Sequence, residues 1–264
     1  MESVQSYSEF LFRWIHVVAG IAWIGHLYFF NFVNAQLAKT YDADSKKKVV
    51  PELMPRALYW FRWGAMYTWV SGLVLAAFSY YMVNNMVPLG SAMSNGTATV
   101  ICLVILLLAF FIYDILWKAV KNETVGVVIS YLLIVATLFG LSRFLIGRAV
   151  YIHIGAFLGT IMMMNVWMRI WPAQKKIIAG IKGTGPAADA SVVAMAGLRS
   201  KHNTYMSVPL VFFMVSNHYP GLYGDEQYGW IIAAIIVLVG WLVTKFLYTK
   251  SASPAPLNIG DKAA

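Results

Sequence analysis

Long apolar segments alternate with short polar ones along almost the whole chain. A membrane-spanning helix needs about 20 mostly apolar residues, and seven segments approach or exceed that length. They cover residues 10–37, 59–83, 97–120, 125–146, 148–171, 204–218 and 228–248. The sixth is the shortest and contains Pro209, so its limits are the hardest to place. No segment alternates apolar and polar residues with period two, which argues against a β-barrel. The pattern predicts an all-α fold, a polytopic transmembrane helical bundle with about seven spans.

The distribution of basic residues predicts how these segments are oriented. The net charge is +9 at pH 7, and lysines and arginines gather after the first, third, fifth and seventh segments. The loops at 84–96 and 219–227 contain neither residue. Since basic loops tend to stay on the cytoplasmic side of a membrane, we expect the N-terminus outside and the C-terminus inside. The basic excess is therefore a topology signal, and no nucleic-acid partner is expected.

The composition is typical of an integral membrane protein whose first partner is the lipid bilayer. Hydrophobic residues make up 60% of the chain and charged residues 12%, and the mean hydropathy is +0.66. We expect one transmembrane domain over residues 1–250 and a disordered cytoplasmic tail over 251–264. Segment 173–201 mixes small residues with lysines around a Gly-Thr-Gly-Pro break, which predicts two short interfacial pieces.

Two histidines on different segments are predicted to lie at the same depth in the membrane. An ionisable residue inside a bilayer is costly, so each one needs a partner or a function. At about 1.5 Å per residue, His16 lies about 9 Å and His153 about 8 Å below the outer boundary. His218, in the motif SNHYP, lies just above that level, whereas His26 and His202 lie further inward.

Paired imidazoles from two helices suit a b-type haem, because its axial ligands approach the iron from opposite faces. His16 and His153 are thus predicted to be the axial ligands of one haem b, which makes residues 1–250 a haem-binding domain. Glycines near these histidines would let the helices approach a flat macrocycle, and arginines at the outer side would pair with its propionates. The glycines are Gly20, Gly155 and Gly159, and the arginines are Arg13, Arg143 and Arg148.

Other interpretations of the same histidines stay open. A histidine inside a membrane often serves only as a hydrogen-bonding group between helices. His218 is an alternative ligand, and His16, His153 and His218 together could bind zinc or copper, since imidazole suits both metals. The single cysteine, Cys102, excludes an intramolecular disulfide and a cysteine-based cluster.

The remaining charged residues within the segments have simpler predicted roles. Asp114 and Lys118 are four residues apart and are expected to form an ion pair. Arg62 and Arg169 lie near inner ends of their segments and are expected to contact lipid phosphates. These four residues therefore carry less weight than the histidines as candidates for chemistry.

Four stretches of the sequence together resemble a known family. They are RWIHVVAGIAWIG (13–25), YWFRWGAMYTWVSG (59–72), HNTYMSVPLVFFMVSNHYP (202–220) and residues 147–167, which include AVYIHIGAFLGTIMMMNVW (149–167). They resemble the N-terminal membrane domain of the bacterial urate hydroxylase family, and the resemblance covers about residues 10–250. It implies a multi-pass oxidoreductase of the bacterial inner membrane that is linked to urate oxidation in purine breakdown.

The resemblance also implies site residues, together with one departure from the family. His16, His153, His202 and His218 match histidines of the family. Family members usually continue into a cytochrome c domain, whereas this sequence contains no Cys-x-x-Cys-His motif. Electrons are therefore expected to leave through a separate partner. His26 stands where the family usually has a small polar residue, and with His202 it is a candidate ligand of a second haem.

The sequence supports three hypotheses about function. The first is a membrane-embedded b-type haem oxidoreductase that resembles urate hydroxylase and passes electrons to an external cytochrome c or to quinone. The second is a non-catalytic haem-binding or structural subunit of a respiratory complex, whose other subunits would be its partners. The third is a transporter or proton channel, although no inverted repeat is apparent in the sequence.

Overall fold

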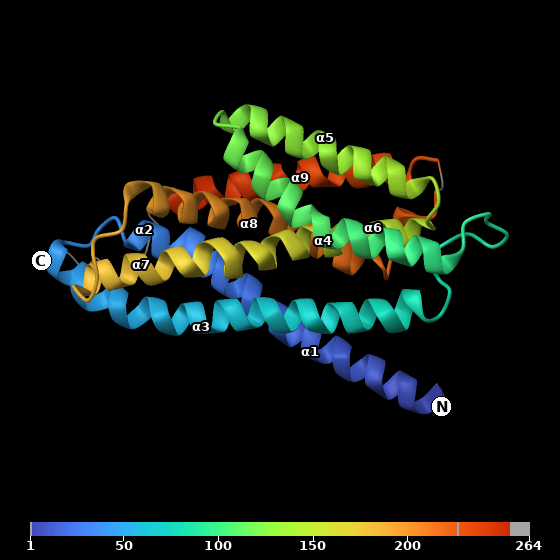
Figure 1. Ribbon diagram of the computed structural model, residues 1–264, viewed down its shortest axis with the longest axis horizontal. Coiled ribbons are helices and arrows are strands. Elements are labelled where there is room, and N and C mark those ends of the chain that lie inside the picture. The colour runs from blue at the N-terminus through green and yellow to red at the C-terminus, as the bar shows by residue number, and fades with distance from the viewer. Residues whose placement is uncertain (1, 226, 254–264) are drawn as a thin grey trace, which may run out of the picture.

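The protein is built from helices that run roughly along one long axis (Figure 1). The computed structural model describes residues 2–225 and 227–253. The α-helices are α1 (Glu2–Tyr28), α2 (Ala35–Leu37), α3 (Ala43–Ala76), α4 (Asn95–Ala119), α5 (Glu123–Ser142), α6 (Gly147–Asn165), α7 (Trp171–Lys182), α8 (Ala190–Ser216) and α9 (Gly229–Ala252). The shorter elements are the π-helical η1 (Phe29–Asn34), η2 (Ala77–Tyr81) and η3 (Val166–Ile170), and the 3₁₀ turn η4 (Pro220–Leu222). The described residues contain no β-strand, which confirms the all-α prediction.

The π-helical segments continue α-helices directly, so the described chain forms seven long helical rods. Each apolar segment predicted from the sequence falls on one rod. Five rods are long and apolar enough to cross a membrane, namely Val4–Leu37, Asn95–Ala119, Glu123–Ser142, Gly147–Lys182 and Gly229–Ala252. The rods that contain α3 and α8 are also long, but they are not among the five that meet this standard of length and apolar composition. The chain therefore has the helical architecture of a membrane protein, and its orientation stays a prediction.

The region between residues 173 and 201 differs from its predicted form. Instead of two short interfacial pieces, it contains most of α7 and the first turns of α8. α7 ends at Gly183, whose φ of +79° is a left-handed conformation that favours glycine and stops a helix. The sixth rod consequently starts at Ala190 rather than near residue 204. Residues 254–264 of the predicted tail lie outside the described residues.

Each of the three π-helical segments carries a polar side chain that bonds to another helix. Asn31 of η1 bonds to α8 and α9, Tyr81 of η2 bonds to α6, and Arg169 of η3 bonds to α4. A π-helical turn adds one residue to a helical turn and is frequent at functional sites. These three segments therefore mark where polar groups enter the bundle, a feature that the apolar pattern of the sequence does not show.

Gly64 of α3 lets the backbones of α1 and α3 approach closely. A Cβ atom at this position would lie 3.0 Å from the backbone nitrogen of Trp23 and 3.2 Å from the carbonyl oxygen of Ala19. Small residues are common at such contacts in membranes, because close packing, rather than the hydrophobic effect, drives helix association there. Figure 1 shows α1 at the edge of the bundle, and α3 is its main neighbour. The attachment of α1 therefore depends on this close approach.

Gly64→Ala is expected to destabilise the protein by about 1–3 kcal/mol, because the neighbouring atoms belong to the backbone and cannot rotate away. Thermal unfolding of the purified protein in lipid nanodiscs measures the change. Gly140→Ala in α5 is the matched control, since nothing lies within 4 Å of a Cβ atom at that position. Equal unfolding temperatures for the two variants would contradict the close approach of α1 and α3.

Candidate functional site

His153 of α6 is the most deeply buried histidine of the described chain, at 1% exposure. Its Nδ1 lies 2.7 Å from the carbonyl oxygen of Ala149, one helical turn earlier. Its Nε2 lies 3.1 Å from the hydroxyl of Tyr81. Because a carbonyl only accepts hydrogen bonds, Nδ1 donates to it and Nε2 accepts from Tyr81. The ring of Tyr80 packs edge-on against the same imidazole, with ring centroids 5.9 Å apart.

Asn217, at the end of α8, joins Tyr80 to an arginine. Its Oδ1 accepts a hydrogen bond of 2.6 Å from the Tyr80 hydroxyl and one of 2.9 Å from Nε of Arg148. The Arg148 guanidinium also lies over the Tyr80 ring, 5.5 Å from its centroid. Arg148, predicted to pair with a haem propionate, is thus bonded to protein groups. We call His153, Tyr80, Tyr81, Arg148 and Asn217 the tyrosine–histidine site.

His16 of α1 lies against α3. Its Nδ1 lies 2.8 Å from the carbonyl oxygen of Thr68 and 3.2 Å from Oγ of Ser71. Gly72 provides room for the ring, since a Cβ atom there would lie 3.0 Å from Cε1 of His16. The carbonyl again makes Nδ1 the donor. His16 therefore links α1 to α3 through a hydrogen bond.

The structure does not bring His16 and His153 together. His16 bonds to Thr68 in the last third of α3, whereas His153 bonds to Tyr81, about 20 Å further along that rod. α3 packs against both α1 and α6, and its Trp69 donates a hydrogen bond of 3.0 Å to Thr160 of α6. In addition, one nitrogen of His153 contacts a carbonyl and the other a phenol. The two residues as folded do not fit one haem held between them, and we derive no step through such a group.

The glycines predicted to make space for a haem face other helices instead. A Cβ atom at Gly155 would lie 2.9 Å and 3.1 Å from two side chains of α8, and one at Gly159 would lie 3.6 Å from Leu210 of α8. A Cβ atom at Gly20 would lie 3.8 Å from Thr68 of α3. All three positions thus face neighbouring helices, with Gly155 in the tightest contact, and these glycines serve helix packing.

The other predicted ligands and ion-pairing residues are scattered over the described structure. Arg13 pairs with Glu9 on its own helix. His218 is exposed beyond the end of α8, and Nδ1 of His26 bonds to a carbonyl of its own helix at 2.7 Å. Within the described chain, no hydrogen bond joins His26 to His202, the pair predicted for a second haem. Among the described residues, no group of three His, Cys, Asp or Glu side chains is placed to hold a metal ion.

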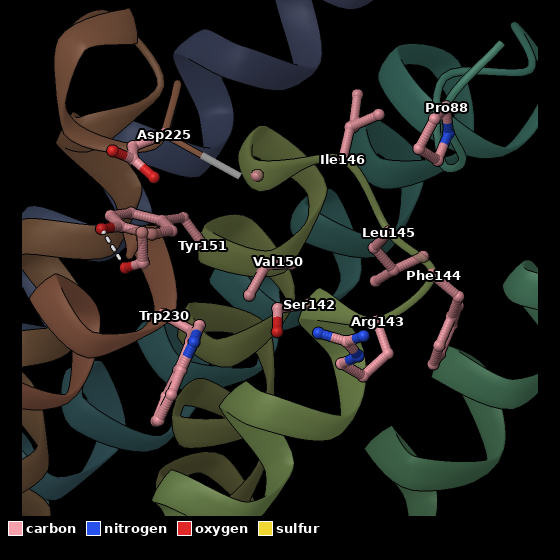
Figure 2. Close-up of a pocket in the computed structure, with 12 residues that line it drawn as sticks. Pro88, Ser142, Arg143, Phe144, Leu145, Ile146, Val150, Tyr151, Asp225 and Trp230 are labelled. Carbon is pink, nitrogen blue, oxygen red and sulfur yellow. Dashed lines mark hydrogen bonds between the residues drawn. The ribbon is translucent and has the colours of Figure 1, made fainter. Parts of the chain in front are cut away.

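Arg143 lines a cavity of about 260 Å³ near the turn between α5 and α6. Figure 2 shows Arg143 and Asp225 on different sides of this cavity, with Trp230 also at its wall. Tyr151, a further lining residue, donates to two main-chain carbonyls at 2.7 Å and 2.8 Å. The cavity is smaller than the roughly 300–1,000 Å³ that small-molecule sites usually have. We therefore assign no ligand to it.

Asp114 of α4 is the centre of a group of charges near the other end of the bundle. Its Oδ1 accepts hydrogen bonds of 2.9 Å from Nε of Arg169 and from Nη2 of Arg199. Its Oδ2 pairs with Arg169 and with Nζ of Lys118, the latter at 2.7 Å. The predicted pair between Asp114 and Lys118 is confirmed. Arg169, which was predicted to contact lipid phosphates, lies in the π-helical η3 and is bonded to this carboxylate.

Tyr113, next to Asp114 in the chain, joins these charges to buried polar groups of α6 and α8. Its hydroxyl lies 2.7 Å from Nδ1 of His202 and accepts a hydrogen bond of 3.1 Å from Nδ2 of Asn165. The same Nδ2 donates to Oδ1 of Asn203 at 2.9 Å. The guanidinium of Arg199 lies over the Tyr113 ring, 4.7 Å from its centroid. The Tyr113 phenol thus contacts His202, Asn165 and Arg199 directly. It is connected to Asn203 through Asn165.

We name this group the arginine–tyrosine cluster; it comprises Tyr113, Asp114, Lys118, Asn165, Arg169, Arg199, His202 and Asn203. Six buried polar side-chain atoms lack a hydrogen-bond partner among the described residues, and four of them belong to this cluster. They are Nε and Nη1 of Arg199, Nε2 of His202 and Oδ1 of Asn165. Because buried polar atoms are nearly always paired, this concentration makes the cluster the strongest candidate binding site.

Several of these residues were not predicted from the sequence to have a role. Asn165 lies in the otherwise apolar stretch MMMNVW, and an amide inside a membrane segment was the available signal. Asn217 precedes His218 in the chain. A role was predicted for the imidazole of His218, but the side chain that bonds to another helical rod is the amide of Asn217, which accepts from Tyr80. Arg62 was expected to contact lipid phosphate, but its guanidinium lies 4.1 Å from the ring centroid of Trp171.

Comparisons with known proteins test the resemblance found in the sequence. No curated protein and no solved structure matches the chain. A family model described as Urate oxidase N-terminal matches residues 2–49 and 41–259, which include the tyrosine–histidine site and the arginine–tyrosine cluster. This match covers nearly the whole chain and confirms the family relationship that the sequence suggested. The chain therefore belongs to the Urate oxidase N-terminal family.

Proposed function

We propose that this protein is the membrane-embedded component of a urate-oxidising system in the bacterial inner membrane. Urate is oxidised, and its electrons pass to a separate acceptor, an external cytochrome c or a quinone. The observation that carries the proposal is the match to a family whose description names urate oxidase over residues 2–49 and 41–259.

Buried polar groups support a catalytic rather than a purely structural role. Polar side chains inside a membrane bundle are costly, and they commonly mark substrate sites or proton relays. Oxidation of urate releases protons as well as electrons, so groups that exchange protons are needed near the substrate. The tyrosine–histidine site offers a neutral imidazole bonded to Tyr81, and the arginine–tyrosine cluster offers His202 bonded to Tyr113. Imidazole and phenol are both suited to proton transfer.

Urate consumption by membranes that contain the full chain tests the proposal. We expect urate to disappear only when cytochrome c or a soluble quinone is added. The amount of acceptor reduced should be proportional to the amount of urate consumed. Membranes from the same host without the protein are the control. Unchanged urate with both acceptors would contradict the proposal, and isolation of the inactive chain with respiratory subunits would then favour the structural alternative. Accumulation of intact urate in sealed vesicles would contradict oxidation in favour of transport.

A further inference from the structure

The arginine–tyrosine cluster contains a charged side chain, Arg199, some of whose hydrogen-bond donors have no partner among the described residues. Asp114 accepts hydrogen bonds or ion pairs from Lys118, Arg169 and Arg199 on its two oxygens. The carboxylate is thus fully engaged, whereas Nε and Nη1 of Arg199 lack a partner among the described residues. The Arg199 side chain is only 3% exposed, so bulk water does not hydrate it. Leaving a buried charged donor unpaired costs more than leaving a neutral one, which favours an acceptor bound at this position.

The directions of the hydrogen bonds identify a second unused donor. Asn165 donates to the Tyr113 oxygen, so the single hydrogen of that hydroxyl is available for His202. Tyr113 then donates to Nδ1 of His202, and in the neutral imidazole the other nitrogen, Nε2, carries the hydrogen. Nε2 is buried and has no partner among the described residues. His202 therefore presents an N–H group in addition to the two unused nitrogens of Arg199.

An unused acceptor and aromatic surfaces complete the cluster. Oδ1 of Asn165 is buried without a described donor, while its Nδ2 is fully engaged. Trp117 packs on the His202 ring with centroids 4.0 Å apart, and Arg199 lies over the Tyr113 ring. Arg199, His202 and Asn165 all contact Tyr113, so the unused donors and the unused acceptor surround one phenol. Donors, an acceptor and flat rings together suit a planar ligand with oxygens and N–H groups on its edge.

The charge of the cluster favours an anion. Three cations, Lys118, Arg169 and Arg199, surround one carboxylate, which leaves a formal charge of +2. The side chains of Lys118 and Arg169 are 58% and 27% exposed, so the cluster extends from the interior to the surface. A positive site that opens to the surface raises the local concentration of anions.

We propose that the arginine–tyrosine cluster binds a planar organic anion of the purine class, which is urate if the proposed function holds. The oxygens of the anion accept from Arg199 and His202, and one of its N–H groups donates to Oδ1 of Asn165. The inference rests on the proposed function for the identity of the ligand, whereas the site itself rests on the unused donors and the charge.

Equilibrium dialysis of the full-length protein in nanodiscs with sodium urate, without any electron acceptor, tests the site. We expect saturable binding that weakens about tenfold or more in Arg199→Gln, because a charge-assisted hydrogen bond is lost. This variant retains Arg169 and Lys118 beside Asp114, so the carboxylate keeps two of its three cationic partners. His202→Phe, which removes the second donor without changing formal charge, is expected to weaken binding in the same way.

Arg62→Gln is the matched control, because Arg62 also has a buried Nε without a described partner but packs on Trp171 outside the cluster. Its urate binding is expected to stay within about twofold of the original protein, since it removes no donor from the cluster. Hypoxanthine, an uncharged purine, and inorganic phosphate are the control ligands, and both are expected to bind more weakly than urate. Equal binding of phosphate and urate would overturn the inference that the site prefers a planar ligand.

Binding and turnover separate this inference from the proposed function. Urate binding that is unchanged in both Arg199→Gln and His202→Phe would overturn the site, even if the membranes oxidise urate. Binding that depends on Arg199 and His202, in a protein that never oxidises urate, would support the site and overturn the oxidative function. Absence of any urate binding to the folded protein would overturn the site as well.

Discussion

Asp114→Asn is expected to destabilise the folded protein by about 3–5 kcal/mol, because it breaks a buried ion pair and leaves one charge without compensation. The side chains of Asp114 and Arg199 are 6% and 3% exposed, so water replaces little of the lost attraction. The same carboxylate also holds Arg169 of η3 and Lys118 of α4, so three contacts weaken at once. Unfolding of the purified protein in nanodiscs, followed by circular dichroism against temperature, measures the loss.

An exposed ion pair provides the control for this prediction. Lys201 and Glu123 form a salt bridge whose side chains are 42% and 55% exposed. Such surface pairs contribute about 0–1 kcal/mol, so Glu123→Gln is expected to change the unfolding temperature little. If Asp114→Asn and Glu123→Gln lower the unfolding temperature equally, the ion pair of Asp114 and Arg199 does not stabilise the fold. The double variant Asp114→Leu with Arg199→Met is expected to recover part of the loss, since it removes both charges.

The helical rods could be predicted from the sequence because a membrane span is defined by a local property. Length and apolar composition determine whether a segment can cross a bilayer, and neither depends on the rest of the chain. The limits of the sixth rod were wrong for a related reason. Its first turns, ASVVAMAGL, are small and mostly apolar, but Arg199 and Lys201 separate them from the apolar run that begins near residue 204. Hydropathy therefore located the second part of this rod and missed that the helix continues through the charged residues to Ala190.

Contacts between neighbouring residues were easier to predict than contacts between rods. The pair of Asp114 and Lys118 follows from a spacing of four residues on a helix, and the structure confirms it. Arg169 and Arg199 lie 55 and 85 residues from the same carboxylate, and no spacing rule connects them. Arg169 also lies in η3, where the π-helical turn changes the face on which it projects. A helical pattern of constant period cannot reproduce that change.

The haem pairing shows what depth along a helix leaves undetermined. His16 and His153 were placed at similar depths by counting residues within two segments, but such counting fixes neither the level of one rod against another nor which rods are neighbours. In the structure α3 packs against both rods and supplies hydrogen-bond partners to each histidine. The glycines were equally ambiguous, since a small residue accommodates a cofactor or another helix with the same ease. Gly155 faces α8, and this assignment could be made only once the packing of the helices was known.

Asn217→Leu is expected to destabilise the protein by about 2–4 kcal/mol, because it leaves two donors without their acceptor. The hydroxyl of Tyr80 and Nε of Arg148 both donate to Oδ1 of Asn217, and Tyr80 is 3% exposed. Thermal unfolding in nanodiscs measures the loss. Asn217→Asp is expected to retain most of the stability, since the carboxylate accepts the same two hydrogen bonds and attracts the Arg148 guanidinium.

His218→Leu distinguishes the role of Asn217 from that of its neighbour. His218 is exposed beyond α8, and exposed substitutions usually change stability by less than about 0.5 kcal/mol. We therefore expect His218→Leu to unfold at nearly the same temperature as the original protein. If His218→Leu is the more damaging of the two variants, then the imidazole, not the amide, makes the contact that matters at the end of α8.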